Sequence, residues 1–397
     1  MAKITYLLGA GASYNACPIL DKQAEMMMKI AEFELEKIFR EIDPVKYAYG
    51  VALKFTNEDN SKIPTDNKSQ ILWHIGYFGK KALEYNTIDT YAKKLHLNGE
   101  TDELKKLKMC VSVFFDLWES FHEERYYHFS NDKHFPLEKK FVPSIFPKYQ
   151  RIDNRYKSLF SILLDRNNNN EIKLNSDFKF ISWNYDLQLE ETFKLFINNG
   201  KFIKNEELND LFKFKEIQKN KIDNDVFHLN GHRGFYNVKS GDTENRFTSF
   251  EEYWENNKIL YNALTEGETN FDNYIKYSWE HSNDDFSNKV HSVLSETEIL
   301  VIIGYSFPAF NRRIDQNMFD SLVPDKVKKI VYQDPNATKE LILNLFKNPN
   351  LFKNKIEVLN NEKSLTQFYL PNDFFITQEN KETIFETTED ELKKINY

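Results

Sequence analysis

Four short segments of the chain combine residue types that could hold or act on a nucleotide. The first follows an apolar run at residues 3–8 and consists of Gly9, Ala10, Gly11, Ala12 and Ser13. Such a loop after a strand is typical of phosphate binding, because Gly9 permits a tight turn and Gly11 lets the backbone approach a pyrophosphate. The pyrophosphate would lie at the N-terminus of the next helix, where free N–H groups favour anions. Alternatively, the two glycines only shape a turn.

Three later segments place polar residues at the ends of predicted strands. Residues 178–186 end in Asn184 and Asp186, residues 226–234 carry His228, Asn230 and His232 into a glycine turn, and residues 299–308 are apolar up to Gly304 and Ser306. The carboxyl ends of buried parallel strands open onto a ligand crevice. The pattern therefore predicts an α/β fold with a Rossmann-like parallel sheet.

In this order, the four segments resemble the motifs of the sirtuin-like family, specifically a zinc-free bacterial branch that hydrolyses NAD in defence against phage. The resemblance implies that Gly9, Gly11 and Ser13 hold the NAD pyrophosphate, and that Gly304 and Ser306 contact the adenosine half. NAD would be the substrate, and no metal is expected. The helical segments would form a module beside the sheet, with the ligand cleft between them.

The same resemblance implies roles for the two polar residues that follow the strand at 178–182. Asn184 would orient the reacting ribose or the attacking water, and Asp186 would contact the nicotinamide amide. The implied reaction is cleavage of the nicotinamide–ribose bond by water, which gives nicotinamide and ADP-ribose. Two other functions remain open: sensing of NAD or an ADP-ribose derivative without turnover, and a scaffold for a partner such as a ring-forming motor ATPase.

The sequence departs from the family at the catalytic histidine. The family has histidine immediately before a glycine, whereas this chain has Asn230 before Gly231, flanked by His228 and His232. Alternate residues of an extended chain point to one face, so either histidine could reach a site next to Asn230 and take a proton from a hydroxyl or water. The alternatives are an ordinary strand histidine at 228 and a solvated turn residue at 232.

The sequence also lacks two features of the protein deacylases in this family. Residues 16–20 replace their Gly-Ile-Pro-Asp-Phe-Arg type segment, and only two cysteines, Cys17 and Cys110, stand where a zinc module would need two pairs. Structural zinc takes about four ligands, so these cysteines predict no zinc site. Two cysteines fit a reduced cytoplasm, and the beginning of the chain predicts no signal peptide.

Composition narrows the possible partners. The net charge of -8 disfavours a dedicated nucleic-acid surface, which would need clustered Lys and Arg. No apolar run approaches the ~20 residues of a membrane span. The 34 Phe and 21 Tyr exceed what one core would bury and suggest subunit interfaces. The family resemblance implies a homo-oligomer or a complex with another defence protein.

The 397 residues exceed a typical single domain and suggest one core with a large insertion. We predict that residues 1–20 and 171–360 form the NAD-binding core, that 21–170 form a mainly helical insertion, and that 361–397 are a helical or frayed tail. Helical patterns lie at 22–42, 70–95 and 103–122, and the last two strands at 329–333 and 356–359. Asn86 or Thr87 is a candidate helix cap.

Overall fold

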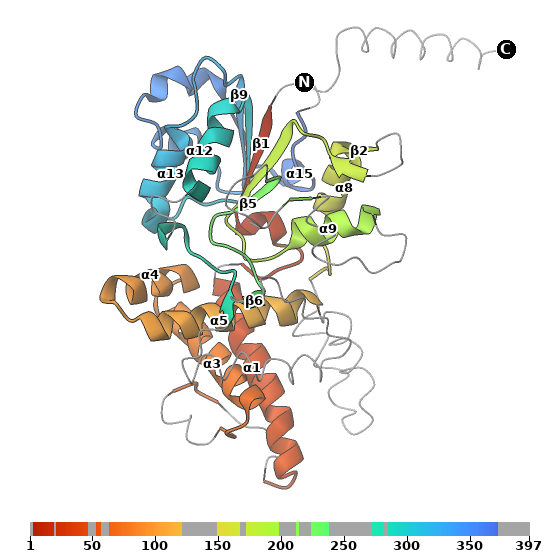
Figure 1. Cartoon of the computed structure of the whole chain (residues 1–397), viewed down its shortest axis with the longest axis vertical. Coiled ribbons are helices and arrows are strands. Elements are labelled where there is room, and N and C mark those ends of the chain that lie inside the picture. Colours follow the sequence, from red (N-terminus) through yellow and green to blue (C-terminus); the bar gives the residue numbers. More distant parts are fainter. Residues whose placement is uncertain are drawn as a thin grey trace, which may run out of the picture.

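A computed structural model describes residues 3–19, 21–46, 53–56, 63–120, 149–166, 172–197, 212–213, 224–237, 271–280 and 285–371. The sheet with its covering helices and a second, helical module lie one above the other (Figure 1). The predicted α/β class is confirmed. Among the described helices, none is both long and apolar enough to cross a membrane.

The centre of the fold is a six-stranded parallel sheet. Its strands, in spatial order, are β10 (Ile356–Leu359), β9 (Lys329–Gln333), β8 (Ile299–Ile303), β1 (Ile4–Leu8), β4 (Phe178–Ser182) and β5 (Val226–His228). When the six strands are numbered in chain order, their spatial order across the sheet, starting from β5, is 3-2-1-4-5-6. This is the order of dinucleotide-binding Rossmann sheets. Leu8 pairs with both Ser182 and Ile303, so β1, β4 and β8 end at the same level.

Both faces of the sheet are covered, which explains why its strands are apolar at consecutive positions. Tyr6, Phe180 and Val301 face one cluster, which includes residues of α8 (Asn154–Leu163) and α9 (Gln188–Ile197). Leu7 and Ile302 face the other, which includes residues of α12 (Asp285–Glu296), α13 (Arg312–Phe319) and α14 (Lys339–Leu343). Figure 1 shows α8 and α9 on the opposite side of the sheet from α12 and α13.

The helical module has its own apolar core. It contains α1 (Asp21–Ile42), α3 (Asn67–Glu84), α4 (Ile88–Asn98) and α5 (Thr101–Ser120). The expectation of one helical run over 70–95 is wrong, because the chain turns at Asn86, whose φ is 69°. Thr87 then caps α4, as its Oγ1 accepts a hydrogen bond from the Thr90 N–H at 3.1 Å. The end of the predicted run at 122 lies outside the described residues.

Several shorter elements join or border the two parts. Two antiparallel ribbons consist of β2 (Leu164–Arg166) with β3 (Ile172–Leu174), and β6 (Phe235–Asn237) with β7 (Phe271–Asn273). Short 3-10 helices are η1 (Ala10–Ser13), η2 (Ser278–Glu280), η3 (Ala309–Asn311), η4 (Pro349–Leu351) and η5 (Lys353–Lys355), and the last described helix is α15 (Glu362–Leu365).

Some segments pack in a different part of the structure from the one that the predicted core, insertion and tail ranges imply. The predicted insertion contains α8, yet Tyr156 and Phe160 of this helix pack on the sheet. Phe235 and Tyr277, from the core range, pack in the helical module. Phe368 of the tail is buried against the sheet, and residues 372–397 lie outside the described part.

Candidate functional site

A cavity of about 360 Å³ lies at the carboxyl ends of the sheet strands. Residues that follow β1, β4, β8 and β9 line one side, and Gln23, Ile88, Asp89 and Phe115 of the helical module line the other. In open α/β sheets, ligands bind where the strand order reverses, which here is between β1 and β8. The volume falls within the range of about 300–1,000 Å³ that small-molecule sites occupy.

The glycine loop after β1 packs directly on the turn after β8. The Gly9 N–H donates to the Ile303 carbonyl and the Gly11 N–H to the Gly304 carbonyl, both at 2.9 Å. A Cβ at Gly304 would lie 2.3 Å from the Ala12 nitrogen, and its φ of 62° also favours glycine. The glycines are therefore needed for backbone contact between two loops. Ala10, Gly11, Gly304 and Ser306 line the cavity, whereas Gly9 and Ala12 do not.

Ser13 joins the glycine loop to the polar residues after β4. Its hydroxyl is buried, donates to Asp186 Oδ1 at 3.1 Å and accepts from Asn184 Nδ2 at 3.2 Å. The Tyr156 hydroxyl lies 3.2 Å away and completes the set as the donor to Ser13, since Ser13 gives its one proton to Asp186. Two motifs 171 residues apart thus share one hydroxyl beneath the cavity.

Asn184 leaves one amide atom unpaired inside the site. The residue is 5% exposed and lines the cavity, and its Oδ1 has no hydrogen-bond partner within the described part of the chain. Turning the amide over would leave the nitrogen unpaired instead. Three further residues of the cavity lining also have a buried polar atom without a hydrogen-bond partner among the described residues: Gln23 Nε2, Trp183 Nε1 and Asn311 Oδ1. Buried unpaired polar groups cost about 1–3 kcal/mol each, and these four belong to residues that line the cavity.

Burial raises the pKa of Asp334 in the cavity lining, and two further carboxyl groups of the lining have pKa values raised to near neutral. Burial, reinforced by the nearby charge of Glu119, raises the pKa of Asp186 to about 7. Burial also raises the pKa of Asp89 to about 6, partly offset by a hydrogen bond from the Tyr185 hydroxyl. Both groups therefore change charge near neutral pH.

The structure places neither candidate histidine in the cavity lining. The Nε2 atom of His228 lies 2.8 Å from Glu190 Oε1, and its Nδ1 lies 3.4 Å from the Asn184 carbonyl. Burial lowers the pKa of His228, but the contact with Glu190, together with the Asn184 carbonyl and the charge of Asp186, outweighs burial, so the net pKa lies above the ordinary value. The contact with Glu190 thus favours the charged form of His228, and its other ring nitrogen lies against the backbone of Asn184.

His232 lies further along the turn. Its Nδ1 contacts the Arg233 carbonyl at 2.7 Å, and its ring stacks on Tyr274. The expectation of an extended chain from 228 to 232 is wrong, because β5 ends at His228 and Gly231 has a φ of 67°. Asn230 does line the cavity, and its Oδ1 accepts a hydrogen bond from the Ser278 N–H at 3.3 Å.

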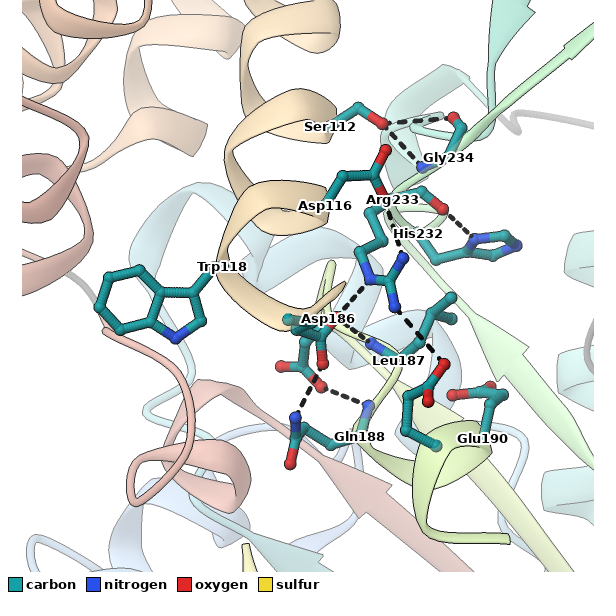
Figure 2. A network of polar contacts seen from close by, with 12 residues as sticks. Ser112, Asp116, Trp118, Asp186, Leu187, Gln188, Glu190, His232, Arg233 and Gly234 are labelled. Carbon is teal, nitrogen blue, oxygen red and sulfur yellow. Dashed lines mark hydrogen bonds and ion pairs between the residues drawn. The ribbon is translucent and has the colours of Figure 1, made fainter. Parts of the chain in front are cut away.

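A buried ionic cluster connects α5 to the loop after β4 (Figure 2). The Arg233 guanidinium is bonded to Asp116 at 2.8 Å and to Glu119, and lies 3.6 Å from Glu191. Glu119 in turn accepts from the Leu187 N–H at 3.0 Å and from Gln188 Nε2 at 2.8 Å. The cluster therefore fixes the two residues that directly follow Asp186.

Arg155 of α8 supports the glycine loop from below. Its Nη2 donates to the Ala12 carbonyl at 2.9 Å and pairs with Asp153 at 2.6 Å, and its guanidinium lies over the rings of Tyr14 and Phe368. It is the one cation in the described cavity lining. Sequence reasoning missed Arg155, and no motif marks it.

Among the described residues, Cys17, Glu119 and Asp186 present potential metal-ligand atoms within 4.8 Å of one another. Burial, together with the charges of Asp186 and Glu119, raises the pKa of the Cys17 thiol well above its ordinary value. A protonated thiol is a poor ligand, and both Glu119 oxygens already accept hydrogen bonds. These features do not favour a metal site.

No protein-family model matches the chain, and a search of curated proteins finds no match.

Proposed function

We propose that the chain hydrolyses NAD at the nicotinamide–ribose bond, giving nicotinamide and ADP-ribose. The observation that carries the proposal is the buried Asn184, whose amide has one atom bonded to Ser13 of the glycine loop and the other unpaired beside the cavity. The cavity also lies where dinucleotides bind in sheets of this strand order.

The reaction suits a site built from fixed dipoles and carboxylates. Nicotinamide leaves as a neutral molecule, so the main task is to hold the ribose and stabilise an oxocarbenium-like transition state. In the proposed reaction, the unpaired amide atom of Asn184 fixes the ribose or the attacking water. Ala10, Gly11 and Gly304, which line the same cavity, would border the pyrophosphate.

The motif resemblance extends this proposal to the biological setting. The order of the glycine loop, Asn184 with Asp186, and Gly304 with Ser306 is similar to that of the sirtuin-like NAD hydrolases of bacterial defence. We accordingly propose a cytoplasmic effector that depletes NAD during phage infection and acts as a homo-oligomer or with a partner such as a motor ATPase.

A second function is favoured by the position of the histidines. His228 is paired with Glu190, and His232 contacts the Arg233 carbonyl, so neither is presented to the cavity. A site without a catalytic histidine could bind NAD or an ADP-ribose derivative as a signal and leave it intact.

Incubation of the full chain with NAD, followed by chromatography, separates the two functions. The hydrolase proposal predicts equal amounts of nicotinamide and ADP-ribose. Asn184→Ala should lower the rate by about 10² or more, the scale for losing one preorganised polar contact, and Asn98→Ala, at an exposed position of α4, should not. Tight binding of NAD without products would support the sensor, and an unchanged rate in Asn184→Ala would contradict the assigned role.

A further inference from the structure

We propose that the Asp186 carboxylate accepts the proton of the attacking water, and that Glu119 of the helical module is the residue that positions it. This inference rests on the proposed NAD hydrolysis. It assigns the proton transfer to a residue that lines the cavity and sits two positions after Asn184.

Among the described residues, hydrogen bonds hold the Asp186 carboxylate at one oxygen only. Ser13 Oγ at 3.1 Å and the Gln188 N–H at 3.2 Å both donate to Oδ1. Within the described part of the chain, no hydrogen bond reaches Oδ2. A carboxylate fixed at one oxygen keeps its other oxygen ready to take a proton from a water held by the neighbouring Asn184.

Glu119 holds the segment that carries Asp186. One of its oxygens accepts from the Leu187 N–H at 3.0 Å, and the other from Gln188 Nε2 at 2.8 Å. Glu119 lies on α5, and Arg233 binds this helix to the core through Asp116 and Glu119. Figure 2 shows Arg233 beside Asp116. The helical module therefore sets both the place and the charge environment of Asp186.

The groups around Asp186 explain why it can act as a base near neutral pH. Those that face it are Glu119 from α5, Glu190 and Gln188 from α9, Cys17 and Ser13 from the segment after β1, Tyr156 from α8 and His228 from β5. Burial is the largest cause of its raised pKa, and Glu119 is the next. A general base is most effective when its pKa lies near the working pH.

The proposed step is balanced without a further reactant. The water oxygen bonds to C1′ of the ribose as the C1′–N bond breaks, and the electron pair of that bond passes to the nicotinamide nitrogen, which becomes neutral. The water proton passes to Asp186 and then to solvent.

The test is the pH dependence of NAD hydrolysis by the full chain, with NAD binding measured separately by calorimetry. The wild-type rate should rise with pH to a plateau, with a midpoint near the pKa of about 7. Asp186→Asn is nearly isosteric and removes the charge that burial opposes, so it should fold. It should lose about 10²–10⁴ of the rate while its NAD affinity changes less than about threefold.

Two variants on α5 separate a role in proton transfer from a purely structural role. Glu119→Gln removes the charge that raises the Asp186 pKa most, so the midpoint should fall by about one pH unit. Asp116→Asn removes a carboxylate from the same Arg233 cluster, but Asp116 is not among the largest causes of the raised Asp186 pKa. Its midpoint should stay at the wild-type value, whatever its rate.

The outcomes distinguish this inference from the function on which it rests. Hydrolysis by the wild type that persists in Asp186→Asn would overturn the assignment of the base and leave NAD hydrolysis intact. Equal shifts in Glu119→Gln and Asp116→Asn would overturn the role of Glu119. Absence of hydrolysis by the wild type at every pH would overturn both proposals.

Discussion

Replacing Arg233 by methionine should strongly destabilise the protein. The Arg233 side chain is 10% exposed and pairs with Asp116 and Glu119, whose side chains are 12% and 3% exposed. Methionine fills much of the same space but leaves these carboxylates buried without a cation. Removing one partner of a buried ion pair costs about 3–5 kcal/mol, so the free energy of unfolding at pH 8 should fall by about that amount.

The same contacts determine how the stability loss in Arg233→Met depends on pH. Burial already raises the pKa of Asp116, and Arg233 holds it lower than burial alone would. Without Arg233 the pKa rises further, and the carboxyl group takes up a proton as the pH falls. The difference in stability between wild type and Arg233→Met should therefore be largest at pH 8 and smaller at pH 5.

Urea unfolding followed by circular dichroism at both pH values measures this difference. Adding Glu119→Gln to Arg233→Met should recover part of the loss, because one buried charge is removed. Lys326→Met is the matched control, since its pair with Glu296 is exposed and should contribute at most about 1 kcal/mol. A loss below about 1 kcal/mol in Arg233→Met, or the same loss at pH 5 and pH 8, would refute the reasoning.

Three further changes test the packing around the site. Gly304→Ala places a Cβ 2.3 Å from backbone atoms at a φ of 62°, so it should cost about 1–2 kcal/mol for the conformation and about 1–3 more for the overlap. Gly99→Ala, with a φ of 72° in open space, should cost only the first amount, and urea midpoints compare the two. Thr87→Ala removes the cap of α4 and should lower stability by about 1 kcal/mol, and a thermal melt with unchanged midpoint would contradict the cap. His228→Gln tests a group whose folded-state pKa is raised: its stability deficit should be full below the ordinary histidine pKa of about 6.5 and shrink as pH rises through the folded-state pKa, so an equal deficit at pH 6 and pH 9 would exclude the charged pair with Glu190.

The sheet could be predicted from the sequence because each strand is a short apolar run that ends in a turn. The runs that end before Gly9 and Gly304 became β1 and β8, and the run before Asn184 became β4. Since parallel strands bring their carboxyl ends to one edge, the expectation that these residues gather at one crevice also followed. The cavity lining contains Gly11, Asn184 and Gly304, as that reasoning requires.

The parts that could not be predicted depend on contacts between residues far apart in the chain. Asn184 and Asp186 both hydrogen-bond to the Ser13 hydroxyl, and Arg233 pairs with Glu119. No local sequence pattern predicts either contact. The turn at Gly231 had a visible signal, because glycine before a polar segment often adopts positive φ. A strand that continued through Gly231 would present both histidines on one face, whereas the chain turns there and His228 pairs with Glu190.

The decisive measurement for the NAD-hydrolase proposal is a crystal structure of the slow Asn184→Ala variant with NAD bound. The proposal predicts NAD in the cavity between β1 and β8, with the pyrophosphate beside Gly11 and Gly304 and the nicotinamide–ribose bond next to residue 184 and Asp186. NAD bound elsewhere on the protein would contradict the proposal. A cavity that holds no NAD, although the wild type hydrolyses NAD, would also contradict it.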